Sequence, residues 1–128
     1  ASTASSYIYG GNFEARGNVV AQNVNGQIGT ATLSFTGTGA QIFTQTSGVL
    51  QKGDVTVNKA SGTLTLGANA SFNQSGQKMF ITAGTVDMNA KNLTINSTLT
   101  ISSGATLTCN GGVLTRGSLA NSGTLNCP

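Results

Sequence analysis

Hydrophobic and polar residues alternate in short segments along the chain. Clear examples are residues 63–66 (Thr-Leu-Thr-Leu), 92–95 (Asn-Leu-Thr-Ile) and 106–109 (Thr-Leu-Thr-Cys). A period of two places the aliphatic side chains on one face of a β-strand and the Thr and Asn side chains on the other. Gly, Asn and Ser separate the segments and supply turns. No stretch shows a helical period, so the pattern predicts an all-β chain of short strands.

The alternating segments recur at intervals close to 22 residues. Three columns of apolar residues keep this interval along almost the whole chain. They are Val20, Ile42, Leu64, Val86, Leu107 and Leu125; Ile28, Leu50, Phe72, Leu93 and Leu114; and Phe13, Phe35, Val57, Met79, Ile101 and Leu119. A common period in several columns is typical of solenoids. We therefore predict a single-stranded, right-handed parallel β-solenoid with three short strands per turn of about 22 residues.

An antiparallel β-sandwich or barrel would also have short strands and frequent turns. Its strand and loop lengths vary freely, however, so it does not require apolar columns with a common period. We therefore favour the solenoid. We expect residues 1–12 to form an N-terminal arm and residues 13–128 to form one solenoid domain.

The two cysteines occupy equivalent positions in the repeat. Cys109 follows Leu107 by two residues, and Cys127 follows Leu125 by two residues. Neighbouring turns lie about 4.8 Å apart, which is inside the range of about 4.4–6.8 Å for the Cα atoms of a disulfide. We predict a Cys109–Cys127 disulfide that staples the last turn; the alternative is two buried thiols. We expect no metal site, because two thiols without a nearby His cannot complete a tetrahedral shell.

Charged residues make up only 7% of the chain, and it has no His. Acid–base catalysis needs a group that titrates near neutral pH or a tuned carboxylate pair. The only acidic residues are Glu14, Asp54 and Asp87, and the two aspartates are expected on different faces. We therefore expect neither an enzyme nor a cofactor.

The six cations are scattered, so we expect no nucleic-acid partner. No apolar run approaches the roughly 20 residues of a membrane span.

The chain begins at Ala1, which is consistent with removal of a signal peptide. Together with the predicted disulfide, this favours an extracellular or cell-surface location. Four Asn-X-Ser/Thr sequons are candidate glycosylation sites if the source organism glycosylates secreted proteins. Their asparagines are Asn69, Asn73, Asn92 and Asn96.

The segments 55–66, 92–96 and 104–108 carry a resemblance to a known group of proteins. They are similar to the Thr/Gly/Asn-rich β-solenoid repeats of large bacterial surface and secreted proteins, among them the filamentous-haemagglutinin-like adhesins. The resemblance covers residues 54–125, a little over half of the chain. It implies a role as a stalk, adhesin or matrix component.

The ends of the predicted solenoid provide the leading functional hypothesis. The sequence shows no amphipathic helix and no cluster of charges to cover either end, and an open turn exposes backbone groups that can pair with another chain. Tyr7, Ile8 and Tyr9 form a candidate strand for exchange with another subunit, and Leu125 is the candidate contact at the opposite end. The alternative for the arm is a frayed terminus or a strand folded over its own first turn. Contacts between top and bottom build filaments, so we expect a secreted structural subunit whose partner is itself.

Two further hypotheses concern binding. Thr63, Thr85, Thr106 and Thr124 are expected to point outward and stack into a ladder, a surface that could bind ice. Exposed strand positions favour Thr in any case. The other hypothesis is a surface adhesin that binds a glycan, for which Tyr7 and Tyr9 are the candidate exposed aromatic residues.

Overall fold

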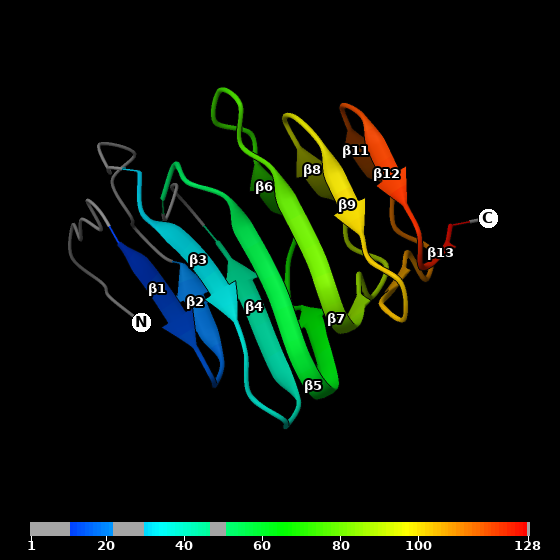
Figure 1. The fold of residues 1–128 in the computed structure, drawn as a ribbon, viewed down its shortest axis with the longest axis horizontal. Helices are drawn as coiled ribbons and strands as arrows, with labels where there is room; N and C mark the ends of the chain where they lie inside the picture. Colours follow the sequence, from blue (N-terminus) through cyan, green and yellow to red (C-terminus); the bar gives the residue numbers. More distant parts are fainter. Residues whose placement is uncertain (1–10, 22–29, 47–50, 128) are drawn as a thin grey trace.

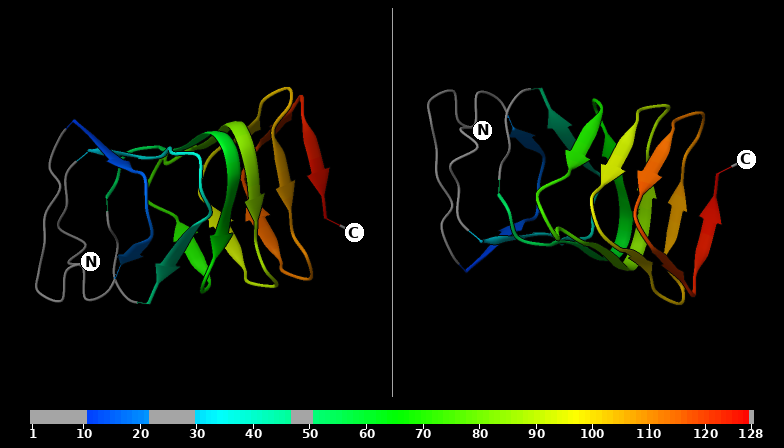
Figure 2. Two further views of the ribbon diagram at one scale, coloured as in Figure 1. Left: turned by 90° about the horizontal axis from the view of Figure 1, so that it is seen from below. Right: turned by 90° about the horizontal axis from the view of Figure 1, so that it is seen from above.

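The computed structural model describes residues 11–21, 30–46 and 51–127. Regular structure in these ranges consists of thirteen β-strands, with no helix. The chain winds through a stack of coils, so that segments roughly 22 residues apart lie side by side (Figures 1 and 2). All neighbouring strands pair in parallel. The predicted β-solenoid is confirmed.

Each complete coil has three sides, which we call A, B and C in chain order. Side A contains β1 (Asn12–Ala15), β3 (Thr32–Phe35), the first parts of β5 (Val55–Leu66) and β7 (Met79–Asp87), β9 (Leu99–Ile101) and β12 (Leu119–Asn121). Side B contains β2 (Val19–Ala21), β4 (Gln41–Gln45), the second parts of β5 and β7, β10 (Thr106–Thr108) and β13 (Thr124–Asn126). Side C contains β6 (Ala70–Phe72), β8 (Leu93–Ile95) and β11 (Leu114–Arg116). Because β5 and β7 continue around a corner, sides A and B form one ten-stranded sheet, and side C forms a three-stranded sheet.

The register confirms part of the predicted columns and corrects the rest. On side B, Leu64, Val86, Leu107 and Leu125 are in register as predicted. The assignment of Ile42 is wrong, because Gln41 pairs with Leu64 while Ile42 pairs with Thr65 and is 43% exposed. Val20 likewise pairs with Thr44.

The remaining corrections shift a residue by two positions, which leaves it on the inward face. Side A has two inward ladders: Phe13, Leu33, Val55, Met79, Leu99, Leu119; and Ala15, Phe35, Val57, Ile81, Ile101, Asn121. The predicted third column mixes them, and on side C Phe72 pairs with Ile95 instead of Leu93. The physical reason is that coil length varies, for example from 18 residues between Thr106 and Thr124 to 24 between Val55 and Met79. A register shift of one residue turns a side chain from the inward to the outward face, whereas a shift of two residues keeps it on the inward face. Ile28 and Leu50 lie outside the described residues.

Inward side chains from the three sides fill the interior. Phe35 of side A, Phe43 of side B and Phe72 of side C meet there. The rings of Phe35 and Phe43 lie edge to face with centroids 5.5 Å apart, and those of Phe43 and Phe72 are stacked at 5.7 Å. All three are at most 5% exposed. Burial of such side chains is the main stabilising contribution, roughly 1.5–3 kcal/mol each.

Side-chain oxygens at the corners bond one coil to the next. Asn69 Oδ1 accepts the Asn92 backbone N–H at 2.9 Å, and Asn92 Oδ1 accepts that of Val113 at 3.1 Å. At another corner, Asp54 Oδ1 accepts the Lys78 N–H at 3.0 Å. These bonds satisfy backbone donors where the strand ladders are interrupted.

Candidate functional site

The last described coil, residues 113–127, differs from the coils in the middle of the stack because its strands have one open edge. Among the described residues, β11 pairs only with β8, β12 only with β9, and β13 only with β10. Figure 2 shows this coil at one end of the stack, beyond the coil that contains β8, β9 and β10. We call residues 113–127 the last coil.

A hollow of about 590 Å³ opens at the last coil, between β11 and β13. Its apolar lining comes from Val113, Leu114, Leu125 and the two cysteines. Val113 is 60% exposed, and Leu114 and Leu125 are only partly buried against the core. Leu125, the predicted subunit contact, is therefore at this surface. Tyr7, Ile8 and Tyr9 lie outside the described residues.

Two inward positions of the last coil carry polar residues. Arg116 pairs with the buried Ile95, and Asn121 pairs with the buried Ile101. Arg116 is among the residues that line the hollow, and its Nη1 donates to the Gly117 carbonyl oxygen at 2.9 Å. An inward-pointing charge hinders indiscriminate strand pairing. Arg116 was not among the predicted site residues, although the alternation from Leu114 to Arg116 indicates an inward position.

Cys109 and Cys127 form a disulfide with their Cα atoms 5.0 Å apart, as predicted. The bond joins the last coil to the one beneath it, inside the stack. It therefore stabilises the coil that has a packing partner on one side only.

The four threonines of the expected ladder are in register on side B. Thr63 pairs with Thr85, Thr85 with Thr106, and Thr106 with Thr124. They alternate with inward residues, so their side chains face outward. The parallel outward row consists of Ile42, Thr65, Asp87, Thr108 and Asn126. The Asp87 carboxylate forms a local hydrogen bond, in which its Oδ1 accepts the Asn89 backbone N–H at 2.8 Å.

The asparagines of all four sequons are exposed and lie at or near side C: Asn69, Asn73, Asn92 and Asn96. Asn69 and Asn92 use Oδ1 in the corner bonds described above, and Asn96 Oδ1 accepts the Gly76 N–H at 3.1 Å. Each of these three asparagines thus uses its oxygen within the fold, while the nitrogen is the atom to which a glycan would be attached.

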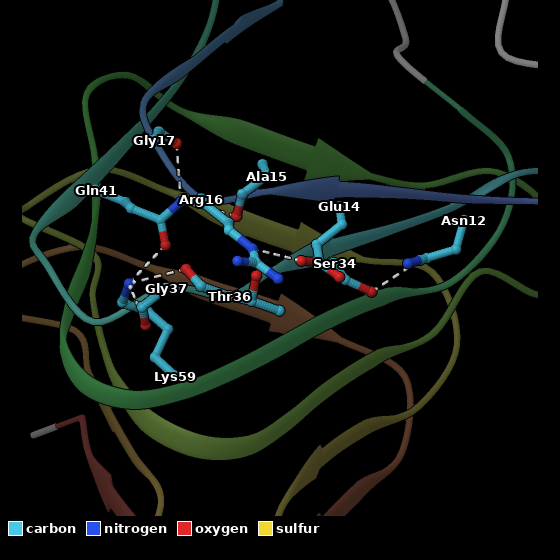
Figure 3. Close-up of polar contacts among 10 residues, drawn as sticks. All are labelled: Asn12, Glu14, Ala15, Arg16, Gly17, Ser34, Thr36, Gly37, Gln41 and Lys59. Carbon is cyan, nitrogen blue, oxygen red and sulfur yellow. Dashed lines mark hydrogen bonds and ion pairs between the residues drawn. The ribbon is translucent and has the colours of Figure 1, made fainter.

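A buried polar network joins three consecutive coils at the corner between sides A and B (Figure 3). Lys59 is fully buried, and its Nζ donates to Gln41 Oε1 at 2.5 Å and to the Thr36 carbonyl oxygen at 3.3 Å. Gln41 Nε2 donates in turn to the carbonyl oxygens of Ala15 and Gly17 at 3.0 and 2.8 Å. Desolvation lowers the pKa of Lys59. The network satisfies a cation that would otherwise be costly to bury.

Near this network on the outer surface, Glu14 Oε1 accepts a hydrogen bond from Arg16 Nε at 2.7 Å (Figure 3). The hydrogen bond and then the positive charge of Arg16 lower the pKa of Glu14. Both side chains are exposed, so the pair contributes little to stability.

The other carboxylates lie apart from each other, Asp54 before β5 on side A and Asp87 at the end of β7 on side B. Within the described ranges, no three His, Cys, Asp or Glu side chains form a group that could hold a metal ion. No helix suited by length and apolarity to crossing a membrane occurs in the part of the chain that the structure describes. The arrangement offers two surfaces, the last coil with its hollow and the threonine face of side B.

Comparisons of the chain with protein-family models, curated proteins and solved structures find no match.

Proposed function

We propose that this chain is a secreted structural subunit that assembles end to end into an extracellular filament or matrix fibre. The observation that supports the proposal is the last coil, whose strands β11, β12 and β13 have unpaired edges among the described residues around an apolar hollow. Parallel addition of another coil would pair these edges and cover the hollow.

The apolar residues at this surface set the strength of the expected contact. Full burial of a Leu or Val side chain contributes roughly 1.5–3 kcal/mol, whereas protein association costs about 4–15 kcal/mol. The side chains available are those of Val113, Leu114, Leu119 and Leu125, which are exposed or partly buried. Their contribution is of the same order as the cost, so we expect assembly that depends strongly on concentration.

Two properties of the chain agree with the proposed extracellular location and self-assembly. A disulfide is typical of oxidising compartments, and this one lies at the coil proposed to form the contact. The low content of charge weakens repulsion between copies, since only 7% of residues are charged.

Negative-stain microscopy and light scattering over a concentration series test this proposal. We expect filaments at high concentration for the native chain and for Ala120→Lys, which adds a charge on the outward face of β12. Leu119→Lys, which places a charge at the neighbouring inward position, should abolish them. A native chain that stays monomeric throughout, or equal assembly by the two variants, would contradict the proposal.

The threonine face supports a second candidate function, binding to ice. Its four threonines are in register, and neighbouring strands lie about 4.8 Å apart, so hydroxyl and methyl groups recur regularly on a β-sheet face. β-Branched side chains are also stiff at χ1, which keeps the array ordered. We expect thermal hysteresis from the native chain and from Thr94→Lys on side C, and its loss in Thr85→Lys. Absence of hysteresis in the native protein would reject this function.

A further inference from the structure

We propose that residues 7–21 of a second copy form the coil that docks on residues 113–127, with Ile8 on Leu114, Phe13 on Leu119 and Val19 on Leu125. This inference rests on the proposed end-to-end assembly and specifies its register. Residues 7–10 lie outside the described residues, so their placement here follows from their sequence and spacing alone.

The first support is an equal spacing of inward positions. In the last coil, the intervals from Leu114 to Leu119 and from Leu119 to Leu125 are five and six residues. From Ile8 to Phe13 and from Phe13 to Val19 they are again five and six. Phe13 and Val19 both face inward, because they pair with the buried Leu33 and Phe43. One coil therefore fits on the other without insertions on any of the three sides.

The second support is complementary size at the polar inward positions. The same register places Gly10 on Arg116, so the docking coil has no side chain where the guanidinium needs room. It places the small Ala15 on Asn121. Phe13 is 38% exposed and meets Leu119, which is only partly buried. Arg116 thus disfavours a bulky residue at the position where this chain has glycine.

The corner glycines give an independent indication. Gly117 and Gly123 pack so closely on the preceding coil that a Cβ would meet the carbonyl oxygens of Ser97 and Ala105. Gly11 and Gly17 are their counterparts in this register, and no described atom lies within 4 Å of a Cβ at either position. A φ of +79° accounts for glycine at position 11, whereas Gly17 lacks a positive φ. Close approach of a second copy would explain why glycine stands there.

Chain length requires the contact to be intermolecular. The five residues from Ile8 to Phe13 span at most about 18 Å. Phe13 and Leu119 are separated by five steps between coils, or about 24 Å at the usual strand spacing. Ile8 therefore cannot reach the last coil of its own chain.

Cysteine cross-linking between two single variants tests the register. The proposed register sets Tyr9 opposite Thr115, which holds an outward position, at a Cα spacing like the 5.0 Å between Cys109 and Cys127. We expect a mixture of Tyr9→Cys and Thr115→Cys chains to give a disulfide-linked dimer on mild oxidation. The matched control is Tyr9→Cys with Thr94→Cys, because Thr94 holds the same outward position one coil deeper. That mixture should give no disulfide-linked dimer. Peptide mapping would verify that the native Cys109–Cys127 disulfide is intact in all variants.

A second variant provides a measure that does not require cross-linking. Gly17→Val should leave thermal unfolding of the monomer unchanged and raise the concentration needed for assembly by about tenfold or more, the equivalent of about 1.4 kcal/mol. Two results would overturn this register and leave the proposed function standing. One is that filaments form while the two cysteine mixtures behave alike. The other is that Gly17→Val forms filaments as readily as the native chain. Absence of both filaments and cross-links would overturn both.

Discussion

The coils in the middle of the stack and the last coil follow the same pattern but differ in what stabilises them. Ile81 and Ile101 are fully buried because they have a coil above and below. The inward residues of the last coil include Leu114, Leu119, Leu125 and Cys127, which stay partly exposed, and Arg116 and Asn121, which are polar. A middle coil is thus stabilised by packing, and the last coil by packing on one side and by a disulfide.

The comparison shows how a coil with one open edge can be stabilised, and what it offers to a partner in the proposed assembly. Stability comes from a covalent bond that needs no further coil above it. In the proposed assembly, selectivity comes from the polar inward residues, which disfavour an unspecific partner and admit one with small residues at matching positions. The polar network of Lys59 performs a different task in the middle of the stack, where it joins coils at a corner.

The largest difference in stability between the middle coils and the last coil should come from truncating an inward side chain in each. Ile81→Ala is expected to cost about 2–5 kcal/mol in the free energy of unfolding. Leu119→Ala in the last coil should cost about half as much or less, since Leu119 is already partly exposed. Urea unfolding of the monomer at low concentration measures both. Equal losses would show that the last coil is as well packed as the middle.

The next effect concerns the disulfide. Its loop spans 18 residues, for which chain entropy gives a stabilisation of about 3 kcal/mol. In the double variant Cys109→Ala, Cys127→Ala we expect faster hydrogen exchange in β12 and β13, with little change in the core of β7. Exchange that accelerates equally along the whole stack would contradict a local role.

Replacing Lys59 should have a moderate effect that depends on pH. Lys59→Met leaves Gln41 Oε1 and buried carbonyl oxygens without a donor, at a cost of about 1–3 kcal/mol at neutral pH. In the native chain the pKa of Lys59 is lowered in the folded state, so the unfolded state binds more protons between the two pKa values. Stability should therefore rise with pH between that lowered pKa and the unfolded value of about 10.4.

The control for this prediction is Lys78→Met, at an exposed position. Urea unfolding in steps from pH 7 to 10.5 should show the rise in the native chain and in this control. In Lys59→Met the rise should be missing. A rise that persists in Lys59→Met would show that another group causes it.

The smallest effect on stability should come from the exposed ion pair of Glu14 and Arg16. We expect an NMR titration to give Glu14 a pKa below 4.5, its ordinary value, and Arg16→Met to return it towards that value. Because the pKa is lowered in the folded state, the pair stabilises the fold above the unfolded pKa of Glu14 and loses this effect as pH falls through the folded pKa. High salt should reduce the shift. An unchanged titration in Arg16→Met would assign the shift to another cause.

Much of the fold could be predicted from the sequence, because a solenoid repeats one local pattern. The alternation in 63–66 and the spacing of Cys109 and Cys127 predicted the strands and the disulfide. The register of Ile42 could not be predicted, because a corner loop of different length moved Gln41 into the core. Hydrophobicity favours Ile at an inward position, and the hydrogen bonds of Gln41 with Lys59, Ala15 and Gly17 compensate for burial of its amide.

The candidate site was less accessible to prediction. The alternation Val55, Val57, Lys59 and the pair Leu114, Arg116 both indicate inward charges. Neither pattern says whether a partner satisfies the charge, since that depends on carbonyl groups contributed by other coils. The size of the hollow depends on the same three-dimensional arrangement.

The hydrogen bonds between coils run along the long axis of the stack, which gives the protein a definite mechanical behaviour. Tension applied to the two ends acts directly on these bonds, and each junction carries the full load. The junction bridged by Cys109 and Cys127 contains a covalent link and resists separation. Under force, rupture should therefore begin at a junction without such a link, and the last two coils should leave together as one unit.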